Sequence, residues 1–233
     1  MLELWNVSKS YRKARVVDKV SFSVEGGQTL GIVGANGAGK TTLTSMIATL
    51  LKPDEGDIVL CGEDLVNHPD RVRPMIGYVP QDIALYETLS GYDNLKFWGK
   101  INGVSGRLLK DRIDSVCRMI RFDDTLLKKR VSDYSGGMKR RLNIGVALLH
   151  EPKLVIMDEP TTGIDMQSGT QILDAIEELR KSGIAVIFVG HYMEEIERIA
   201  THICVMNGGK VAYFGEKEKV LNGRTLTEVL EDL

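Results

Sequence analysis

The feature that most constrains this chain is the glycine-rich segment at residues 34–41, which reads G-A-N-G-A-G-K-T. It fits G-x-x-x-x-G-K-[ST], the pattern of a phosphate-binding P-loop. A polyphosphate needs backbone N–H groups directed at its oxygens. The three glycines of the segment, Gly34, Gly37 and Gly39, omit Cβ atoms that would hold it away, and they allow the positive φ that a curled loop requires. Lys40 can reach the phosphates, and the Thr41 hydroxyl can complete the shell of a Mg²⁺ ion. The segment therefore predicts binding of a nucleoside triphosphate with Mg²⁺.

The residues around this loop fit the same interpretation. Residues 29–33 are predicted to form a short buried strand before the loop. Residues 41–51 are predicted to form a helix that stops at Lys52-Pro53, because proline cannot continue it. The N-terminus of such a helix favours an anion.

A second strong signal is the run Leu154-Val155-Ile156-Met157, which ends in Asp158 and Glu159. Four consecutive apolar residues are typical of a strand that is buried on both faces. We expect this strand to lie beside the P-loop strand. There Asp158 would hold Mg²⁺ through water, and Glu159 would polarise the attacking water.

Two further polar residues follow predicted strands. Gln81 ends the strand at 76–80, and His191 follows the strand at 184–189. Each residue taken singly is more often structural. The carboxyl ends of strands in a doubly wound sheet, however, are where such a sheet places its ligand. The Gln81 carbonyl could there reach Mg²⁺ or the attacking water.

The chain divides into stretches of different character. Residues 1–28 are predicted to form antiparallel strands at 2–7, 16–17 and 20–24, with Tyr11 in a polar segment between the first two. Residues 29–82 and 151–233 form the predicted α/β core. Residues 83–150 are predicted to be an inserted helical subdomain, because helical periodicity appears at 94–100 and 108–120. The fold class expected is α/β, a P-loop NTPase with a RecA-like parallel-sheet core, an N-terminal antiparallel β part and an inserted α-helical part.

Within the insertion, Ser135-Gly136-Gly137 precedes an amphipathic helix at 138–149. Ser135 is a plausible N-cap, and the two glycines expose backbone N–H groups at the start of the helix. After the carboxylate pair, Asp165 leads into a helix predicted at 166–181.

Composition narrows the partners. The net charge is −2 over 233 residues, and no block of like charge gives an argument for a nucleic-acid partner. No apolar run approaches the ~18 residues that a membrane span needs. Residues 1–20 lack a signal-peptide pattern, so we expect any membrane role to use a separate chain. Cys61, Cys117 and Cys204 are scattered, which favours free thiols in a reducing cytosol.

Taken in order, these segments resemble the cassette of ABC transporter ATPases over essentially the whole chain. The motifs that carry the resemblance are residues 34–41, Gln81, Ser135-Gly136-Gly137, Asp158-Glu159, Asp165 and His191. The resemblance implies that two cassettes, a homodimer when ATP is bound, meet head to tail, with each ATP between one P-loop and the Ser-Gly-Gly segment of the other. Closure and hydrolysis then drive a transmembrane permease. The cassette would be cytoplasmic and peripheral on the inner face of the membrane.

The resemblance also implies roles for individual residues. Tyr11 would stack on adenine, Asp165 would signal across the dimer, and His191 would bond the γ-phosphate. Catalysis would rest on Glu159, His191, Lys40 and Gln81, and Gln81 would also contact the permease. Mg²⁺ would be held by Thr41, Gln81 and, through water, Asp158. The ATP-contacting residues of one chain would be Tyr11, Val16, Gly34, Ala35, Asn36, Gly37, Ala38, Gly39, Lys40, Thr41, Thr42, Gln81, Asp158, Glu159 and His191, with Ser135, Gly136, Gly137 and Asp165 from the other chain.

The chain departs from the common L-S-G-G-Q at two positions, where Tyr134 replaces Leu and Met138 replaces Gln. Met138 cannot donate a hydrogen bond to a nucleotide, whereas the backbone N–H groups of the glycines are unaffected. The form S-G-G-M-K-R-R-L, together with the residues at 85–90 and 93–95, is similar to cassettes of bacterial multidrug, antibiotic, lipid or sodium exporters. This similarity favours export.

Two other functions remain open at the level of sequence. One is an importer cassette. The other is a soluble ABC ATPase without a transporter, of which the iron–sulfur assembly type is the hardest to exclude. A ribosome-type factor would need two cassettes, and a repair ATPase would need a long coiled coil between Lys40 and Ser135.

Overall fold

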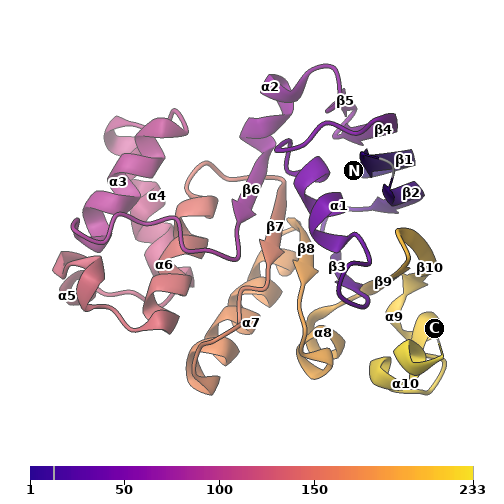
Figure 1. Cartoon of the computed structure of the whole chain (residues 1–233). Helices are drawn as coiled ribbons and strands as arrows, with labels where there is room; N and C mark the ends of the chain where they lie inside the picture. The colour runs from indigo at the N-terminus through magenta and orange to yellow at the C-terminus, as the bar shows by residue number, and fades with distance from the viewer. Residues whose placement is uncertain (13, 233) are drawn as a thin grey trace.

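The computed structural model describes residues 1–12 and 14–232, which form two β-sheets and the helices packed on them (Figure 1). The larger sheet has the order β10-β9-β3-β8-β7-β6. Its strands are β3 (Thr29–Val33), β6 (Ile76–Val79), β7 (Leu154–Asp158), β8 (Ala185–Val189), β9 (His202–Asn207) and β10 (Lys210–Glu216). All neighbours pair in parallel except β9 with β10, which pair antiparallel. Strands β3, β7 and β8 are buried along their whole length, as their apolar runs predict.

The smaller sheet is antiparallel and has the order β2-β1-β4-β5. Its strands are β1 (Leu2–Tyr11), β2 (Ala14–Val24), β4 (Glu55–Leu60) and β5 (Glu63–Asp64). The separate strands expected at 16–17 and 20–24 are one continuous strand, and Tyr11 ends β1 instead of lying in a linker. Shifts in the β1–β2 register and a left-handed Lys19 (φ 50°) show a bulge where sequence suggested a break. The sheet also includes β4 and β5, from the stretch assigned to the core; the domain boundaries stay a prediction.

Helix α1 (Lys40–Ile47) packs between the two sheets, with Leu43 and Ile47 fully buried. It ends four residues before the expected Leu51. Thr49 has a φ of 62°, so the helical path is already broken before Pro53 is reached. The prediction of the helix end was therefore wrong.

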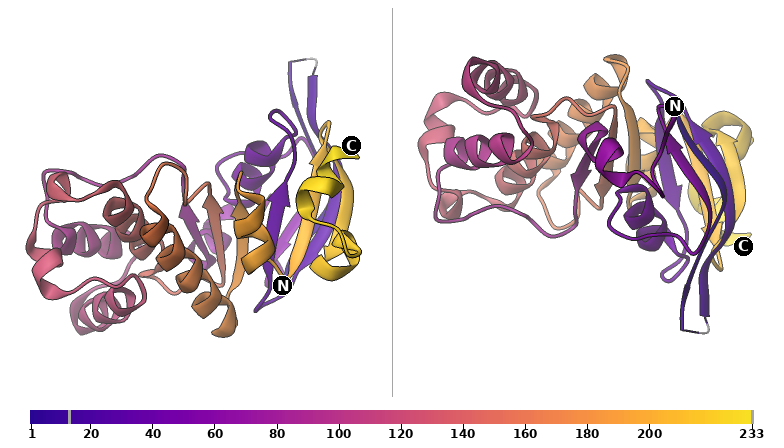
Figure 2. Two further views of the ribbon diagram at one scale, coloured as in Figure 1. Left: turned by 90° about the horizontal axis from the view of Figure 1, so that it is seen from below. Right: turned by 90° about the horizontal axis from the view of Figure 1, so that it is seen from above.

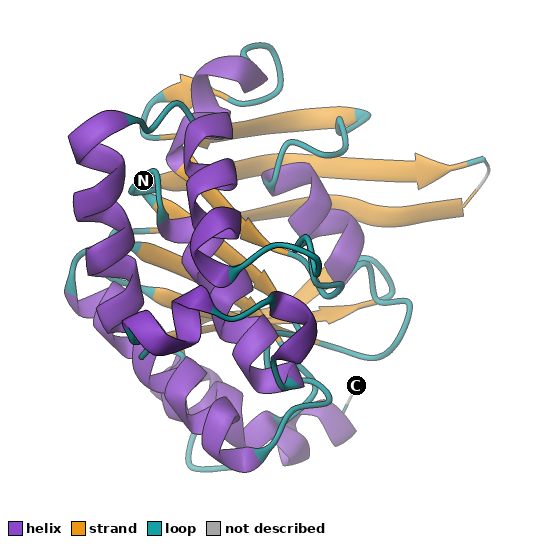
Figure 3. Cartoon of the chain, turned by 90° about the vertical axis from the view of Figure 1, so that its left-hand side faces the viewer, coloured by secondary structure: helices purple, strands orange, loops and turns teal. Residues whose placement is uncertain are grey.

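A helical region lies at one end of the molecule, and the antiparallel sheet lies at the other (Figure 2). It consists of α3 (Gly91–Ile101), α4 (Gly106–Met119), α5 (Asp124–Lys128) and α6 (Gly136–Leu148), and Figure 3 shows it in front of the strands. The remaining helices are α2 (Pro69–Val72), α7 (Met166–Lys181), α8 (Met193–Ile199), α9 (Lys217–Leu221) and α10 (Leu226–Glu231), with 3₁₀ turns at Arg73–Met75 and Val131–Asp133. The α/β class with an antiparallel β part and a helical insertion is confirmed.

The core follows from strand alternation. Val155 and Met157 of β7 pack on the side of α6 and α7, whereas Leu154 and Ile156 pack on the side of α1. Cys117 and Cys204 are buried and Cys61 is exposed, all as free thiols. Burial raises the pKa of Cys117 to about 11 and that of Cys204 to about 12, so both thiols act as small apolar residues. Within the described residues, every helix is too short or too polar to cross a membrane.

Candidate functional site

The predicted site residues gather at the carboxyl edge of the parallel sheet. Strands β6, β7 and β8 point to this common edge in Figure 1, where they lead into Gln81, Glu159 and His191, while β3 leads into the P-loop. Strand β7 is not the direct neighbour of β3, because β8 lies between them. The expectation that these two strands lie side by side was wrong, yet the shared edge still brings their ends together.

The P-loop turns into α1 around a buried lysine. Lys40 is 8% exposed, and its Nζ donates to the carbonyl oxygens of Gly34 (2.7 Å) and Ala35 (3.1 Å). Burial lowers the pKa of Lys40, and the charges of Glu159 and Asp158 act in the opposite direction. The ammonium group is thus held inside the loop, within the field of the two carboxylates from β7.

The three glycines of the loop are required for different reasons. A Cβ on Gly34 would lie 2.1 Å from the carbonyl oxygen of Met206, and one on Gly39 would lie 2.5 Å from that of Val16. A Cβ on Gly37 would meet open space, so only the left-handed φ of 80° at this position favours glycine. The sequence argument attributed all three to room for the phosphates and to backbone with positive φ, and all three have positive φ (149°, 80° and 96°). The structure also shows that Gly34 and Gly39 let the loop pack against the protein's own backbone.

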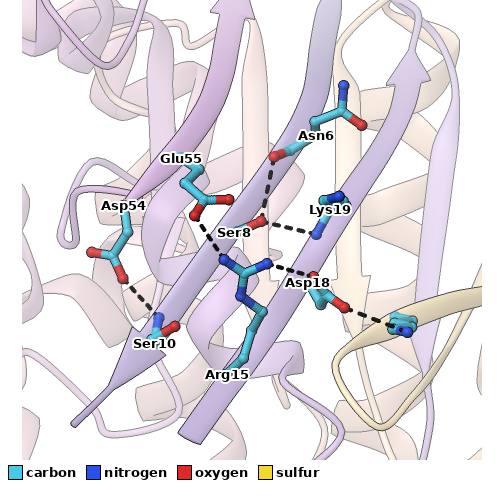
Figure 4. Close-up of polar contacts among 9 residues, drawn as sticks. Asn6, Ser8, Ser10, Arg15, Asp18, Lys19, Asp54 and Glu55 are labelled. Atoms are coloured by element: carbon cyan, nitrogen blue, oxygen red, sulfur yellow. Dashed lines mark hydrogen bonds and ion pairs between the residues drawn. The ribbon is translucent and has the colours of Figure 1, made fainter. Parts of the chain in front are cut away.

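The backbone that confines the loop is held by a polar network on β2, drawn in Figure 4. Arg15 bridges Asp18 (2.9 Å) and Glu55 (2.7 Å). The Asp18 N–H donates to the Gly209 carbonyl at 2.8 Å, and the Gly209 N–H donates to the Ala38 carbonyl at 3.2 Å. The turn between β9 and β10 therefore ties the P-loop to the antiparallel sheet.

A pocket opens over the loop. Its lining residues are Val16, Asn36, Gly37, Ala38, Gly39, Lys40, Thr41, Thr42, Glu159 and His191, all of them predicted from sequence. Tyr11, half-exposed at the end of β1, is not among these lining residues, and its stacking on adenine stays a prediction. The pocket unites the P-loop with the ends of β7 and β8.

Glu159 is the centre of the polar contacts at this edge. Its Oε1 lies 2.5 Å from Nε2 of His191, and its Oε2 accepts from Nε2 of Gln81 at 2.9 Å. The residue has a left-handed φ of 50°, and its N–H donates to the Val189 carbonyl at 2.8 Å. This backbone conformation is energetically unfavourable for a residue other than glycine, and such conformations cluster at functional sites, where they fix the direction of a side chain. The resemblance placed Gln81 at the metal and His191 at the phosphate, whereas here both contact Glu159.

Asp158 precedes Glu159 and is only 4% exposed. Burial, followed by the charge of Glu159, raises the pKa of its carboxyl, while Lys40 and His191 lower it. Asp158 and Glu159 are adjacent carboxylates at the largely buried end of β7, and their charges repel each other. This repulsion favours binding of a cation, which would lie between the carboxylates and a bound phosphate. Carboxylate and hydroxyl oxygens are ligands that suit Mg²⁺, so Asp158 and Thr41 fit that ion.

The raised pKa of Asp158 gives a testable effect on stability. The pKa of Asp158 is higher in the folded protein than in the unfolded chain. The free energy of unfolding therefore falls as the pH rises from the unfolded-state pKa through the folded-state pKa, and an asparagine, which does not titrate, avoids this fall. We expect Asp158→Asn to melt at a higher temperature than the wild type at about pH 8, and this advantage to vanish near pH 4. Melting curves across this range test it, with exposed Asp57→Asn as the control. A difference that is independent of pH would contradict the assignment.

The other predicted residues form a second group. Ser135 caps α6 by accepting from the Met138 N–H at 3.2 Å, which confirms the predicted cap. Asp165 caps α7 by accepting from the Ser168 N–H at 2.9 Å. A Cβ on Gly137 would lie 2.1 Å from Oγ of Ser168, so the two helix starts are in close contact. These residues are absent from the lining of the pocket over the P-loop.

This close contact predicts the effect of a single methyl group. Gly137→Ala should lower the melting temperature by roughly 3–10 °C, since overpacking costs about 1–3 kcal/mol. Ser168→Gly removes the opposing atoms, so the double variant should regain most of that loss relative to Ser168→Gly alone. Thermal melts of the four proteins test the pair. Additive losses would show that Gly137 is required for another reason.

Of the two departures from L-S-G-G-Q, Tyr134 lies in the hydrophobic core and Met138 packs against it. Tyr134 is 6% exposed, its hydroxyl donates to the Leu126 carbonyl at 2.6 Å, and its ring packs on Phe122. A Cβ on Gly91 would lie 2.4 Å from that hydroxyl, which explains the glycine at the start of α3. Met138 packs, partly buried, against the same core. Sequence reasoning missed the pairing of Tyr134 with Gly91, because no local signal joins residues so far apart.

Comparisons with known proteins agree with this geometry. The family model described as ABC transporter matches residues 17–162. The linearmycin resistance ATP-binding protein LnrL of Bacillus subtilis is 40% identical, over 98% of this chain and 74% of the relative. The Nod factor export ATP-binding protein I of Cupriavidus metallidurans is 35% identical, over 99% of this chain and 76% of the relative. A solved structure of an ATP-binding subunit of an ABC transporter has a TM-score of 0.89 and 28% identity, and covers 100% of this chain and 98% of its own. The family match includes the P-loop, Gln81 and Glu159, whereas Asp165 and His191 lie beyond it.

Proposed function

Because the chain belongs to the ABC transporter family of ATP-binding proteins, we propose that it hydrolyses ATP to drive export of a substrate through a separate transmembrane permease. The observation that carries the proposal is the Glu159 carboxylate, held at the rim of the P-loop pocket by Gln81 and His191. A general base needs such a fixed direction toward the γ-phosphate of a bound nucleotide.

The chemistry follows from these positions. Lys40 and the backbone N–H groups of the loop would bind the phosphates and balance their charge. Glu159 would take a proton from the attacking water. The oxygen of that water would bond to the γ-phosphorus, while the bond from the γ-phosphorus to the bridging oxygen breaks and ADP leaves with that oxygen. Gln81 and His191 would orient that carboxylate. Mg²⁺, held by Thr41, Gln81 and, through water, Asp158, would supply charge for the phosphate oxygens.

We propose that the working unit is a head-to-tail homodimer. Ser135, Gly136, Gly137 and Asp165 lie apart from the P-loop pocket of their own chain, so their backbone N–H groups would reach a nucleotide bound by a second copy. A helix N-terminus with two glycines is suited to an anion. ATP between the copies would close the dimer, and hydrolysis would release it.

An apolar pocket next to Gln81 supports a transmembrane partner. It is lined mainly by α3, α6 and β6 and includes Tyr78, Pro80 and Trp98. Exposed apolar surface of this kind often marks a place where another protein binds, so a docked permease segment would cover the walls of the pocket. The chain would then be a peripheral protein on the cytoplasmic face of the membrane.

Export is favoured by the names of the relatives, which refer to linearmycin resistance and Nod factor export. The alternatives are an importer cassette and a soluble ATPase of the iron–sulfur assembly type. The test is affinity isolation of the chain from gently solubilised native membranes, with ATP and in a Glu159→Gln background. Co-purification of an exporter-like permease is the expected result. Soluble partners alone, with the chain absent from membranes, would refute the transport function and leave the ATPase site standing.

A further inference from the structure

Helix α6 holds the segment that follows β6 at three points. Nη1 of Arg140 donates to the Pro80 carbonyl at 2.9 Å. The Ala84 N–H donates to Oδ1 of Asn143 at 3.3 Å. Lys139 forms an ion pair with Glu87 at 2.5 Å. These contacts lie at both ends and near the middle of residues 80–87, and they join this segment to α6.

Arg140 is the unusual member of this set. It is 6% exposed, donates to a neutral carbonyl, and its Nε has no hydrogen-bond partner among the described residues. Burial lowers the pKa of the guanidinium, and the charges of Asp82 and Glu159 oppose that shift. A buried charge is costly, and an apolar side chain of similar volume often fits such a position as well or better. The contact that an apolar residue could not make here is the hydrogen bond from Arg140 to the Pro80 carbonyl.

The position of its acceptor suggests a reason. The Pro80 carbonyl belongs to the residue directly before Gln81, whose amide donates to Oε2 of Glu159 at 2.9 Å. The same α6 begins at Ser135-Gly136-Gly137, the segment proposed to meet the nucleotide of the second copy. One rigid helix thus links the start of α6 to the residue beside the proposed base.

We infer that Arg140 is a positioning residue for Gln81. It fixes the carbonyl directly before Gln81, so that the direction of the Gln81 amide toward Glu159, and with it hydrolysis, depends on the Arg140–Pro80 hydrogen bond. This inference rests on the proposed ATP hydrolysis. Arg140 contacts the Pro80 carbonyl and is not among the residues that line the nucleotide pocket. Its replacement is therefore expected to change the rate of turnover and not the affinity for ATP.

The test is a double-mutant cycle on purified protein. Arg140→Met should lower kcat by about tenfold and change the KM for ATP by less than about twofold. In a Gln81→Ala background the same change should have almost no further effect, since the residue through which Arg140 acts is gone. Arg140→Lys retains a donor and should recover part of kcat, and it also serves if the methionine variant is unstable.

The matched control is Arg141→Met. Arg141 lies on the same helix, also has an unpartnered Nε, and donates to the Ile120 carbonyl at 2.9 Å instead of to the Gln81 segment. Its effect on kcat should therefore be independent of Gln81→Ala. The inference is wrong if Arg140→Met has the kcat of the wild type. It is also wrong if Arg140→Met lowers kcat by the same factor in the Gln81→Ala background as in the wild type. If the wild-type chain itself hydrolyses no ATP, the proposed function fails, and this inference with it.

Discussion

Glu159→Gln is expected to lose ATP turnover by about 10²–10⁴-fold, because a positioned general base contributes about that factor. The amide has the same shape as the carboxylate but cannot accept the proton of water. The contacts with Gln81 and His191 show that the side chain is held in one direction, so little of this loss should come from disorder. ATP binding should persist, since Lys40 and the P-loop are unchanged. The variant should accumulate as an ATP-bound dimer.

Steady-state ATPase assays, nucleotide-binding titrations and size-exclusion chromatography with ATP measure these three quantities. Glu178→Gln, at an exposed position of α7, is the matched control and should behave like the wild type. Near-normal turnover of Glu159→Gln would remove Glu159 from the role of base and would direct attention to Asp158 or to a base in the second copy.

Lys40→Ala is expected to weaken ATP binding by a factor of about 10 to 100 or more, since a hydrogen bond to a charged group contributes about 1.5–3 kcal/mol. The ammonium lies inside the loop, where it contacts the Gly34 and Ala35 carbonyls. Triphosphate oxygens are far stronger acceptors than these carbonyls, so a bound nucleotide should draw the ammonium toward itself. Without it, the negative phosphates would face Asp158 and Glu159 with no fixed cation from the protein.

Fluorescence titration with a labelled ATP analogue measures this affinity. Lys40→Met keeps most of the side-chain volume, and it separates loss of charge from loss of packing in the buried loop. Exposed Lys52→Ala is the control and should bind like the wild type. Unchanged affinity in both Lys40 variants would mean that the glycine-rich segment does not bind phosphate.

Much of the fold was predictable because its signals are local. Strand β3, helix α7 and the cap at Ser135 appear where the sequence placed them. These predictions rest on runs of apolar residues, on helical periodicity and on single capping residues, all contained within a few consecutive positions. Errors arose where tertiary packing overrides local preference. Examples are the early end of α1 at Ile47 and the bulged continuity of β2.

By itself, the sequence determined that this chain has a P-loop, a buried strand that ends in Asp158-Glu159, and an order of motifs typical of one family. The reason is that phosphate binding requires consecutive backbone N–H groups, which one short segment encodes. Only the tertiary structure decided that Glu159 contacts Gln81, 78 positions away, and His191, 32 positions away. It also decided that Gly34 and Gly39 pack against Met206 and Val16. Those contacts depend on which strands are neighbours and on the direction of each side chain. Neither property can be predicted from a single short segment of the sequence.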